Sequence, residues 1–185
     1  LEAAKDVAAE FINGRPNDNI GITLFAGETF TQCPLTVDHA VLLDMIHNIK
    51  CGLITDGTAV GMGIANAVTR LKDSKAKSKV IILLTDGTNN KGDISPMTAA
   101  EIAKSFGIRV YTIGVGTNGM APYPYPVGNT VQYVSMPVEI DEKTLTEIAG
   151  TTDGNYFRAT SNSKLKEVYE EIDKLEKTKL NVKEY

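Results

Sequence analysis

The sequence predicts a three-layer α/β fold. Helices are expected on both faces of a mostly parallel sheet that carries one antiparallel edge strand. The first observation is the run Val80–Leu84, where five unbroken apolar residues precede Thr-Asp-Gly. Such a run is typical of a strand buried on both faces, as parallel strands are beneath helices. The second is the alternation of strand-like and helix-like segments, which indicates parallel strands joined by right-handed crossovers.

The N-terminal segments predict a helix followed by a hairpin. Residues 1–12 place small apolar and charged residues at helical spacing, and the pattern ends at Asn13-Gly14, a typical helix C-terminus. Residues 19–25 and 29–33 are apolar and rich in β-branched side chains. The short Ala-Gly-Glu stretch between them favours an antiparallel hairpin.

The later segments continue the alternation. Thr36 can cap a helix that reaches about residue 49. The apolar face of that helix is predicted to comprise Val37, Val41, Met45 and Ile49. Further helices are predicted over residues 59–72, 96–106, 141–149 and 161–177, and strands over 80–84, 108–115 and 155–158.

Residues 116–139 interrupt this alternation, with four prolines, three tyrosines and no helical period. A segment this long is usually functional or flexible. It follows the carboxyl end of the 108–115 strand. Two interpretations stay open: a self-packed excursion with a small hairpin around Gly128-Asn129, or a surface whose Tyr and Pro residues contact a partner.

Two oxygen-bearing side chains form the candidate site. Asp86 follows the buried strand, at the end where open α/β sheets place ligands, and Thr58 stands just before a predicted helix. A hydroxyl and a carboxylate are ligands that Mg²⁺ prefers. An isolated Asp-Gly often only forms a turn, and we assign this role to Asp56. For Asp86, the presence of Thr58 in the neighbouring loop favours a metal-binding role instead. Thr85 and Asn89 are expected to support the site.

At these residues the chain resembles a von Willebrand factor A (vWA) domain. That family binds a divalent cation through an Asp-x-Ser-x-Ser loop, a distant Thr and a distant Asp, and Thr58 and Asp86 match the last two. The resemblance covers nearly the whole chain. It is strongest to the bacterial aerotolerance-operon (Bat) proteins, because of the opening Leu-Glu-Ala-Ala-Lys and the Phe-Ala-Gly-Glu turn. It implies a Mg²⁺ or Mn²⁺ site that an acidic residue of a protein partner completes.

One family motif is absent from residues 1–185. No Asp-x-Ser-x-Ser occurs, and the family would place it just before Leu1. We therefore expect a single vWA domain that lacks its first strand and this loop, and that holds the ion only if the upstream loop is present. The family's first strand lies between the two strands that contain Ile22 and Ile82. Unpaired strand edges are costly, so we expect another segment, such as a strand exchanged from a second copy, to fill this space. Direct pairing of the two edges is the less favoured alternative.

The resemblance implies a metal-ion-dependent protein–protein interaction module and no enzymatic activity. It also implies a bacterial cell-envelope location, as the soluble domain of a membrane-anchored protein on the periplasmic side. Two alternatives stay open: a structural domain with an idle metal site, and a Mg²⁺-dependent phosphotransfer enzyme. The second generally needs a nucleophilic Asp or a phosphate-directed lysine, and Lys91 is the only lysine in the two loops.

Composition argues against several other classes. The net charge is −4 with scattered Lys and Arg, which gives no basis for nucleic-acid binding. No apolar run approaches the ~18 residues of a membrane helix, so membrane attachment is expected only through segments outside this chain. The Gly-x-Gly-x-x-Gly at 114–119 matches a dinucleotide motif, but the prolines that follow forbid the required helix, and no small-molecule substrate is predicted.

The cysteines and histidines suggest no catalytic or zinc chemistry. Cys33 and Cys51 flank a predicted helix outside any Cys-x-x-Cys pair, so we expect two free thiols. His39 and His47 lack the spacing of a zinc site and are expected to be exposed or half-buried. The charged segment 163–179 is predicted to be a solvated helix face.

Overall fold

The computed structural model describes residues 2–27, 29–49, 57–86, 91–116, 119–127, 130–138 and 140–182. The helices are α1 (Glu2–Asn13), α2 (His39–His47), α3 (Val60–Leu71), α4 (Pro96–Ser105), α5 (Glu142–Thr151) and α6 (Asn162–Val182). The strands are β1 (Ile20–Phe25), β2 (Thr29–Thr36), β3 (Val80–Thr85), β4 (Arg109–Val115), β5 (Gly119–Val127), β6 (Thr130–Val138) and β7 (Tyr156–Ala159).

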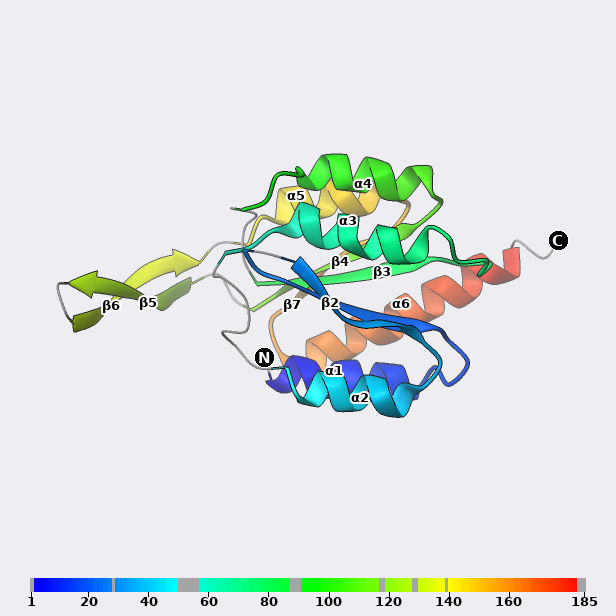
Figure 1. Ribbon diagram of the computed structural model, residues 1–185, viewed down its shortest axis with the longest axis horizontal. Coiled ribbons are helices and arrows are strands. Elements are labelled where there is room, and N and C mark those ends of the chain that lie inside the picture. Colours follow the sequence, from blue (N-terminus) through cyan, green and yellow to red (C-terminus); the bar gives the residue numbers. More distant parts are fainter. Residues whose placement is uncertain are drawn as a thin grey trace.

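These elements form the α/β fold in three layers that the sequence predicts. Strands β3, β4 and β7 make a parallel sheet in that order, with Val80 opposite Arg109 and Thr112 opposite Tyr156. Helices α3, α4 and α5 cover one face of this sheet, and α1, α2 and α6 lie on the other side (Figure 1). None of the described helices is long and apolar enough to cross a membrane.

The layer of α3, α4 and α5 is held by small and branched apolar side chains. Buried alanines of α4 let the helices approach closely, and Ile64 of α3 and Ile148 of α5 are fully buried in the same cluster. Local sequence sets the helix ends. Ser95 accepts a hydrogen bond from the Thr98 amide, with Pro96 at the first helical position, where its missing N–H costs nothing.

The opposite layer packs α6 against β4. Tyr111 and Ile113 of β4 are buried with Leu165 and Ile172 of α6. Helix α1 joins this cluster through aromatic and apolar side chains. The strand β4 is therefore covered on both faces, as parallel strands beneath helices are.

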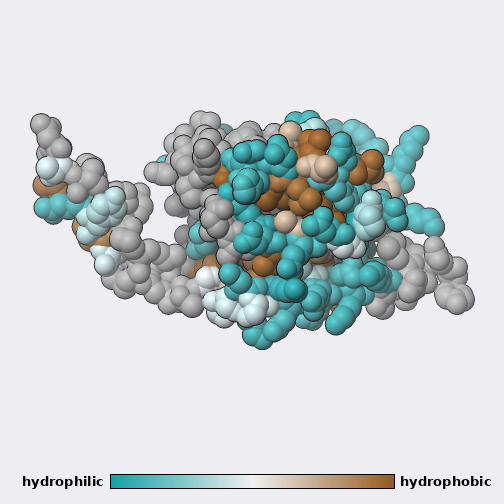
Figure 2. Space-filling view, turned by 90° about the horizontal axis from the view of Figure 1, so that it is seen from below, coloured by the Kyte–Doolittle hydropathy of each residue, from teal (hydrophilic) through white to brown (hydrophobic). Residues whose placement is uncertain are grey.

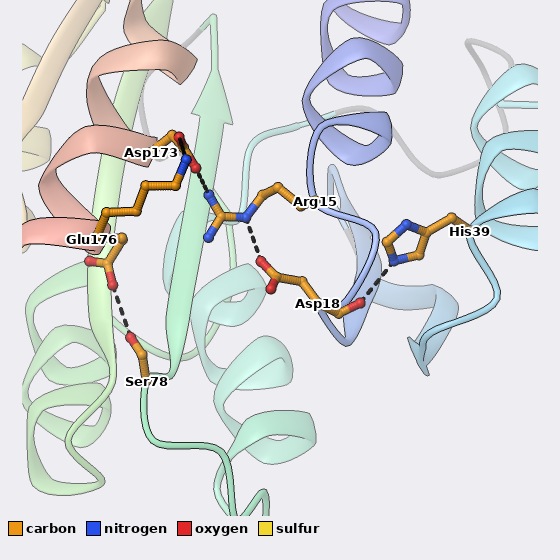
Figure 3. A network of polar contacts seen from close by, with 7 residues as sticks. Arg15, Asp18, His39, Ser78, Asp173 and Glu176 are labelled. Atoms are coloured by element: carbon orange, nitrogen blue, oxygen red, sulfur yellow. Dashed lines mark hydrogen bonds and ion pairs between the residues drawn. The ribbon is translucent and has the colours of Figure 1, made fainter. Parts of the chain in front are cut away.

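Polar contacts also fasten the helices of this layer together (Figure 3). Arg15, just after α1, donates hydrogen bonds to Asp18 and to Asp173 of α6. The ring of His39, at the start of α2, lies 2.8 Å from the Asp18 carbonyl oxygen. Arg15 and the turn that contains Asp18 thus connect α1 and α2 with α6, which is distant from them in sequence.

A buried polar cluster lies where α6 crosses the amino ends of β3 and β4. Arg109 donates two hydrogen bonds to the Glu176 carboxylate, Nε to Oε1 at 2.9 Å and Nη2 to Oε2 at 2.6 Å. Tyr111 donates a third at 2.6 Å and Ser78 a fourth at 2.9 Å. Glu176 is only 4% exposed. The prediction of a simple solvated face for residues 163–179 is therefore wrong at this position.

The strands β1 and β2 form the predicted antiparallel hairpin, with Ile22 opposite Cys33. Among the described residues, β1 pairs only with β2, and β3 pairs only with β4. Ile22 and Ile82 therefore do not lie on directly paired strands. This agrees with our expectation, in which direct pairing was the less favoured alternative. That an additional strand fills the space between β1 and β3 stays a prediction.

The structure corrects the start and the buried face of α2. β2 continues to Thr36, and Asp38 caps the helix by accepting a hydrogen bond from the Val41 amide. The helix starts later than predicted, and its buried side chains are Leu42 and Ile46, which pack with Ile12 and Cys33. Two residues of the predicted face are exposed instead, Val37 at 65% and Val41 at 43%.

Most of residues 116–139 form a long hairpin rather than a small one. All nine residues of β5 pair with those of β6, from Gly119 opposite Val138 to Val127 opposite Thr130. This hairpin extends well away from the body of the domain (Figures 1 and 2). We refer to residues 119–127 and 130–138 as the arm. The predicted hairpin is therefore present and its strands pack on each other, but it is longer than predicted and projects from the domain.

The remaining small predictions hold where they can be checked. Cys33 is a free, buried thiol, and Cys51 lies outside the described residues. His39 is half-buried and His47 exposed. A strand, not a helix, starts at Gly119, so the Gly-x-Gly-x-x-Gly match has no helix to support dinucleotide binding.

Candidate functional site

The candidate site lies at the carboxyl edge of the parallel sheet. Asp86 directly follows β3 and its side chain is exposed, whereas the preceding Thr85 is buried. This contrast follows from the strand itself, in which side chains alternate between faces until the chain leaves the sheet. Asp86 is thus the first residue after β3 that can present a carboxylate to solvent.

Thr58 reaches the same edge from the other side of the crossover. It is half-buried and lies two positions before α3, whose N-cap residue, Ala59, makes no side-chain capping bond. The positive end of the helix dipole at such a terminus favours negatively charged groups nearby. Gly57 has φ +133°, a conformation that other residues rarely adopt, so a glycine is required immediately before Thr58.

The two loops that carry Thr58 and Asp86 are in direct contact. The chain that returns from Asp86 reaches Lys91, whose amide donates a hydrogen bond of 3.2 Å to the Thr58 carbonyl oxygen. Gly92, at φ +97°, then passes so close to α3 that an added Cβ would lie 2.8 Å from the Met62 side chain. The structure therefore brings the loop after β3 and the start of α3 together.

Gly61 explains how close this approach is. A Cβ at Gly61 would stand 2.0 Å from the backbone oxygen of Ile94, so only a glycine lets the first turn of α3 lie against the returning loop. The sequence contains this signal as a glycine early in a predicted helix. The reason for this glycine is clear only from the tertiary structure, which places Ile94 against the first turn of α3.

Thr58 and Asp86 offer oxygen ligands, the kind that a hard cation binds. Two side chains are fewer ligands than such an ion needs. A threonine hydroxyl and a carboxylate are oxygen ligands of the kind that Mg²⁺ takes, usually with several waters retained. Among the residues that the structure describes, no three His, Cys, Asp or Glu side chains gather closely enough to hold a metal ion. Two further residues that the sequence places in these loops, Asp56 and Asn89, lie outside the described ranges.

A hollow lies away from this edge, between α1 and α6. It has a volume of about 290 Å³ and is lined in part by Phe11, Tyr169 and Asp173. Charged pairs span it, including Lys166 with Glu10 at 2.9 Å. The ring centroids of Phe11 and Tyr169 are 4.8 Å apart. Because its charges are already paired across the two helices, we interpret this hollow as part of their packing.

Comparisons with known proteins agree with this architecture. The family model of the von Willebrand factor type A domain matches residues 1–171. A UPF0353 protein of Nocardia farcinica is 30% identical over 94% of this chain and 56% of its own length. The chain spans about half the length of the curated relatives it matches.

Solved structures of bacterial proteins are similar in both sequence and fold. The conserved hypothetical protein BatB from Bacteroides thetaiotaomicron has a TM-score of 0.80 and 33% identity, covering 95% of this chain and 88% of that one. An aerotolerance-related membrane protein from Bacteroides fragilis has a TM-score of 0.79 and 29% identity, covering 94% and 86%.

A more distant structure shares the fold alone. Proximal thread matrix protein 1 from the mussel byssus, in a form described with a zinc-occupied MIDAS motif, has a TM-score of 0.71 and 24% identity. It covers 94% of this chain and 40% of the mussel chain.

Proposed function

The chain belongs to the von Willebrand factor type A domain family, and from that membership we propose that it acts as a metal-ion-dependent protein–protein interaction module. The observation that carries the proposal is the contact between the Thr58 loop and the loop that follows Asp86. It brings the loops of a hydroxyl and an exposed carboxylate to one edge of the sheet. This is where open α/β sheets bind ligands.

Thr58 and Asp86 are the residues we propose as protein ligands of Mg²⁺ or Mn²⁺. When bound, such an ion supplies a Lewis acid that can hold a carboxylate from a partner protein. Two side chains are few for this task. The proposal therefore needs further oxygen ligands, which an Asp-x-Ser-x-Ser loop upstream of Leu1 would supply.

The partner chemistry follows from the same site. Because several of the proposed ligands are neutral hydroxyls, the ion would stay able to attract another anionic oxygen, which favours an acidic side chain as the incoming ligand. We therefore propose a protein partner that binds through Glu or Asp, and a binding rather than an enzymatic role. The mussel protein described with an occupied MIDAS motif supports metal binding by this fold, although not by this chain.

The cellular setting is proposed from the relatives. The Bacteroides fragilis protein is described as an aerotolerance-related membrane protein, and it resembles this chain over nearly its whole length. We extend that description to a bacterial envelope assembly, in which this chain would be a membrane-anchored domain on the periplasmic side. The anchor would lie outside residues 1–185.

The decisive experiment measures Mn²⁺ binding by electron paramagnetic resonance, for residues 1–185 and for a chain extended upstream of Leu1. We expect binding weaker than micromolar for the former and clear binding for the extended chain. Asp86→Asn removes the negative charge at the site and Thr58→Val removes a hydroxyl ligand, so each variant should weaken binding by the extended chain at least about tenfold. A glutamate-containing peptide should increase the Mn²⁺ affinity, whereas its glutamine analogue should not.

Asp73→Asn is the matched control. It makes the same change of charge at an exposed aspartate just beyond the far end of α3, which has 12 residues and so is about 18 Å long. This variant should bind Mn²⁺ as the unaltered chain does. Failure of the extended chain to bind Mn²⁺, or equal losses in Asp73→Asn and Asp86→Asn, would refute the metal site and leave a structural domain with an idle site.

A further inference from the structure

The arm differs chemically from the rest of the chain. Residues 119–138 contain no Asp, Glu, Lys, Arg or His, although charged residues make up 23% of the sequence. Exposed side chains on the arm include Tyr133 at 72%, Val134 at 47% and Val127 at 45%. The described residues of β5 and β6 pack chiefly on each other and not on another helix or strand. Within the described part of the chain, the arm is thus an uncharged, two-stranded ribbon with two free edges.

The prolines make these two edges unequal. Pro122, Pro124 and Pro126 alternate along β5, and each is paired with a residue of β6. Antiparallel pairs alternate between hydrogen-bonded and non-hydrogen-bonded types. Since proline has no N–H, unbroken pairing requires all three to occupy non-hydrogen-bonded pairs, where the backbone groups point away from the partner strand. The outer edge of β5 therefore lacks the donors that strand addition needs.

The outer edge of β6 keeps its donors from Val131 to Ser135. Its one proline, Pro137, lies near the base of the arm, opposite Met120, and does not interrupt this stretch. The residues opposite the three prolines are Ser135, Tyr133 and Val131, and they share the non-hydrogen-bonded pairs. Their N–H and C=O groups consequently point outward along β6. This edge can accept a further antiparallel strand, whereas the edge of β5 cannot.

An isolated two-stranded hairpin is only marginally stable in water, and a sheet of more strands is the usual remedy. The open edge of β6 is self-complementary, because two antiparallel copies exchange the same donors and acceptors about a two-fold axis. The net charge of −4 makes two copies repel each other, but the arm contributes no charge to that repulsion. We propose that two copies of this chain associate through their β6 edges into a four-stranded sheet, β5-β6-β6-β5.

The proposed four-stranded sheet cannot add further copies. Both of its outer edges are β5 edges blocked by proline, so the association stops at a dimer instead of continuing as a fibre. A register centred on Tyr133 pairs Tyr133 with Tyr133 and Val131 with Ser135, which gives roughly six hydrogen bonds between the copies. Each strand has nine residues and spans about 30 Å, so the two bodies lie at opposite ends of the sheet. This inference does not depend on the metal site.

Sedimentation velocity of the chain over about 10–500 µM tests the proposal, because the dimer fraction must rise with concentration. Tyr133→Pro removes the central N–H at the outward edge, and Pro124 directly opposite it indicates that a proline is tolerated in this pair. We expect this variant to weaken dimerisation at least about tenfold while its circular dichroism and melting temperature stay unchanged. Tyr133→Ala, which keeps the N–H, should still dimerise.

Cross-linking provides an independent measurement of the register. In a background with Cys51 replaced by serine, Tyr133→Cys places two thiols at the two-fold axis, where the Cα atoms should be about 5.5 Å apart. A short bis-maleimide should link these copies, and should not link Val127→Cys, which lies near the arm's tip. A monomer at all concentrations, or equal dimerisation of Tyr133→Pro and the unaltered chain, would overturn the proposal. Loss of dimerisation in Tyr133→Ala equal to that in Tyr133→Pro would also do so.

Discussion

Replacing Glu176 with alanine is expected to lower the free energy of unfolding by about 3–5 kcal/mol, the typical cost of removing one partner from a buried ion pair. The carboxylate accepts hydrogen bonds from Arg109, Tyr111 and Ser78. Without it, the Arg109 guanidinium, whose side chain is 11% exposed, stays buried without its counter-charge. The loss therefore comes chiefly from the groups left behind, not from the net strength of the pair.

Urea denaturation of Glu176→Ala and of a surface control would measure this effect. Glu167 pairs with Lys164 at 2.7 Å, and both side chains are more than half exposed. Glu167→Ala should consequently change stability by less than about 1 kcal/mol. A double variant, Glu176→Leu with Arg109→Met, should regain much of the lost stability because no buried charge remains. Equal stabilities of Glu176→Ala and Glu167→Ala would contradict this account of the cluster.

The same cluster predicts a dependence of stability on pH. Burial alone would raise the pKa of Glu176, but hydrogen bonds from Arg109, Tyr111 and Ser78 outweigh it and hold the pKa below its ordinary value of 4.5. A carboxyl whose pKa is lower in the folded state stabilises the protein above the unfolded pKa. That contribution is lost as the pH falls through the folded pKa. The stability difference between the unaltered chain and Glu176→Ala should therefore be full near neutral pH and shrink below about pH 4.5.

Gly61→Ala is expected to lower the free energy of unfolding by about 3 kcal/mol, at the upper end of the cost of overpacking. The new Cβ would stand 2.0 Å from the Ile94 backbone oxygen and 2.8 Å from the Ser95 carbonyl carbon. A backbone atom cannot rotate away as a side chain can, so the returning loop has to separate from α3. Because this loop continues from Asp86, the variant should also weaken metal binding by the extended chain.

Gly150→Ala is the matched control for this substitution. Gly150 lies in α5, and the position that an added Cβ would take has no neighbouring atom within 4 Å. Alanine is favoured over glycine in a helix, so this variant should gain up to about 1 kcal/mol. Thermal melts of the two variants should therefore move in opposite directions. Similar melting temperatures would mean that the loop adapts to Gly61→Ala without separating from the helix.

Much of the fold was predictable because its signals are local. The five apolar residues of Val80–Leu84 are stable only when they are buried, which indicates a strand inside a sheet. Ser95 and Pro96 set the start of α4 through capping contacts that involve only four residues. The start of α2 was predicted wrongly because two local signals competed there. Thr36 and Asp38 can both cap a helix, and the pairing of β2, which extends to Thr36, decides in favour of Asp38.

Of the candidate site, the sequence predicted the residues but not their surroundings. Thr58 and Asp86 were identifiable because the end of a buried strand and the start of a helix mark places where ligands bind. The contact of Lys91 with Thr58, and the role of Gly61 against Ile94, join segments some 30 residues apart. Such contacts depend on how α3 packs beside the loop after β3, which no local pattern encodes.

The sequence by itself thus determined the order of helices and strands, the buried strands and the residue types at the sheet's carboxyl edge, because hydrophobic periodicity and capping act over a few neighbouring residues. Only the tertiary structure decided that Glu176, within a charged helix, is buried against Arg109. It also decided that the prolines of β5 share one edge of the arm, because the partner of each residue is set by pairing across the hairpin. Burial and pairing depend on contacts between distant segments, and these exist only once the chain has folded.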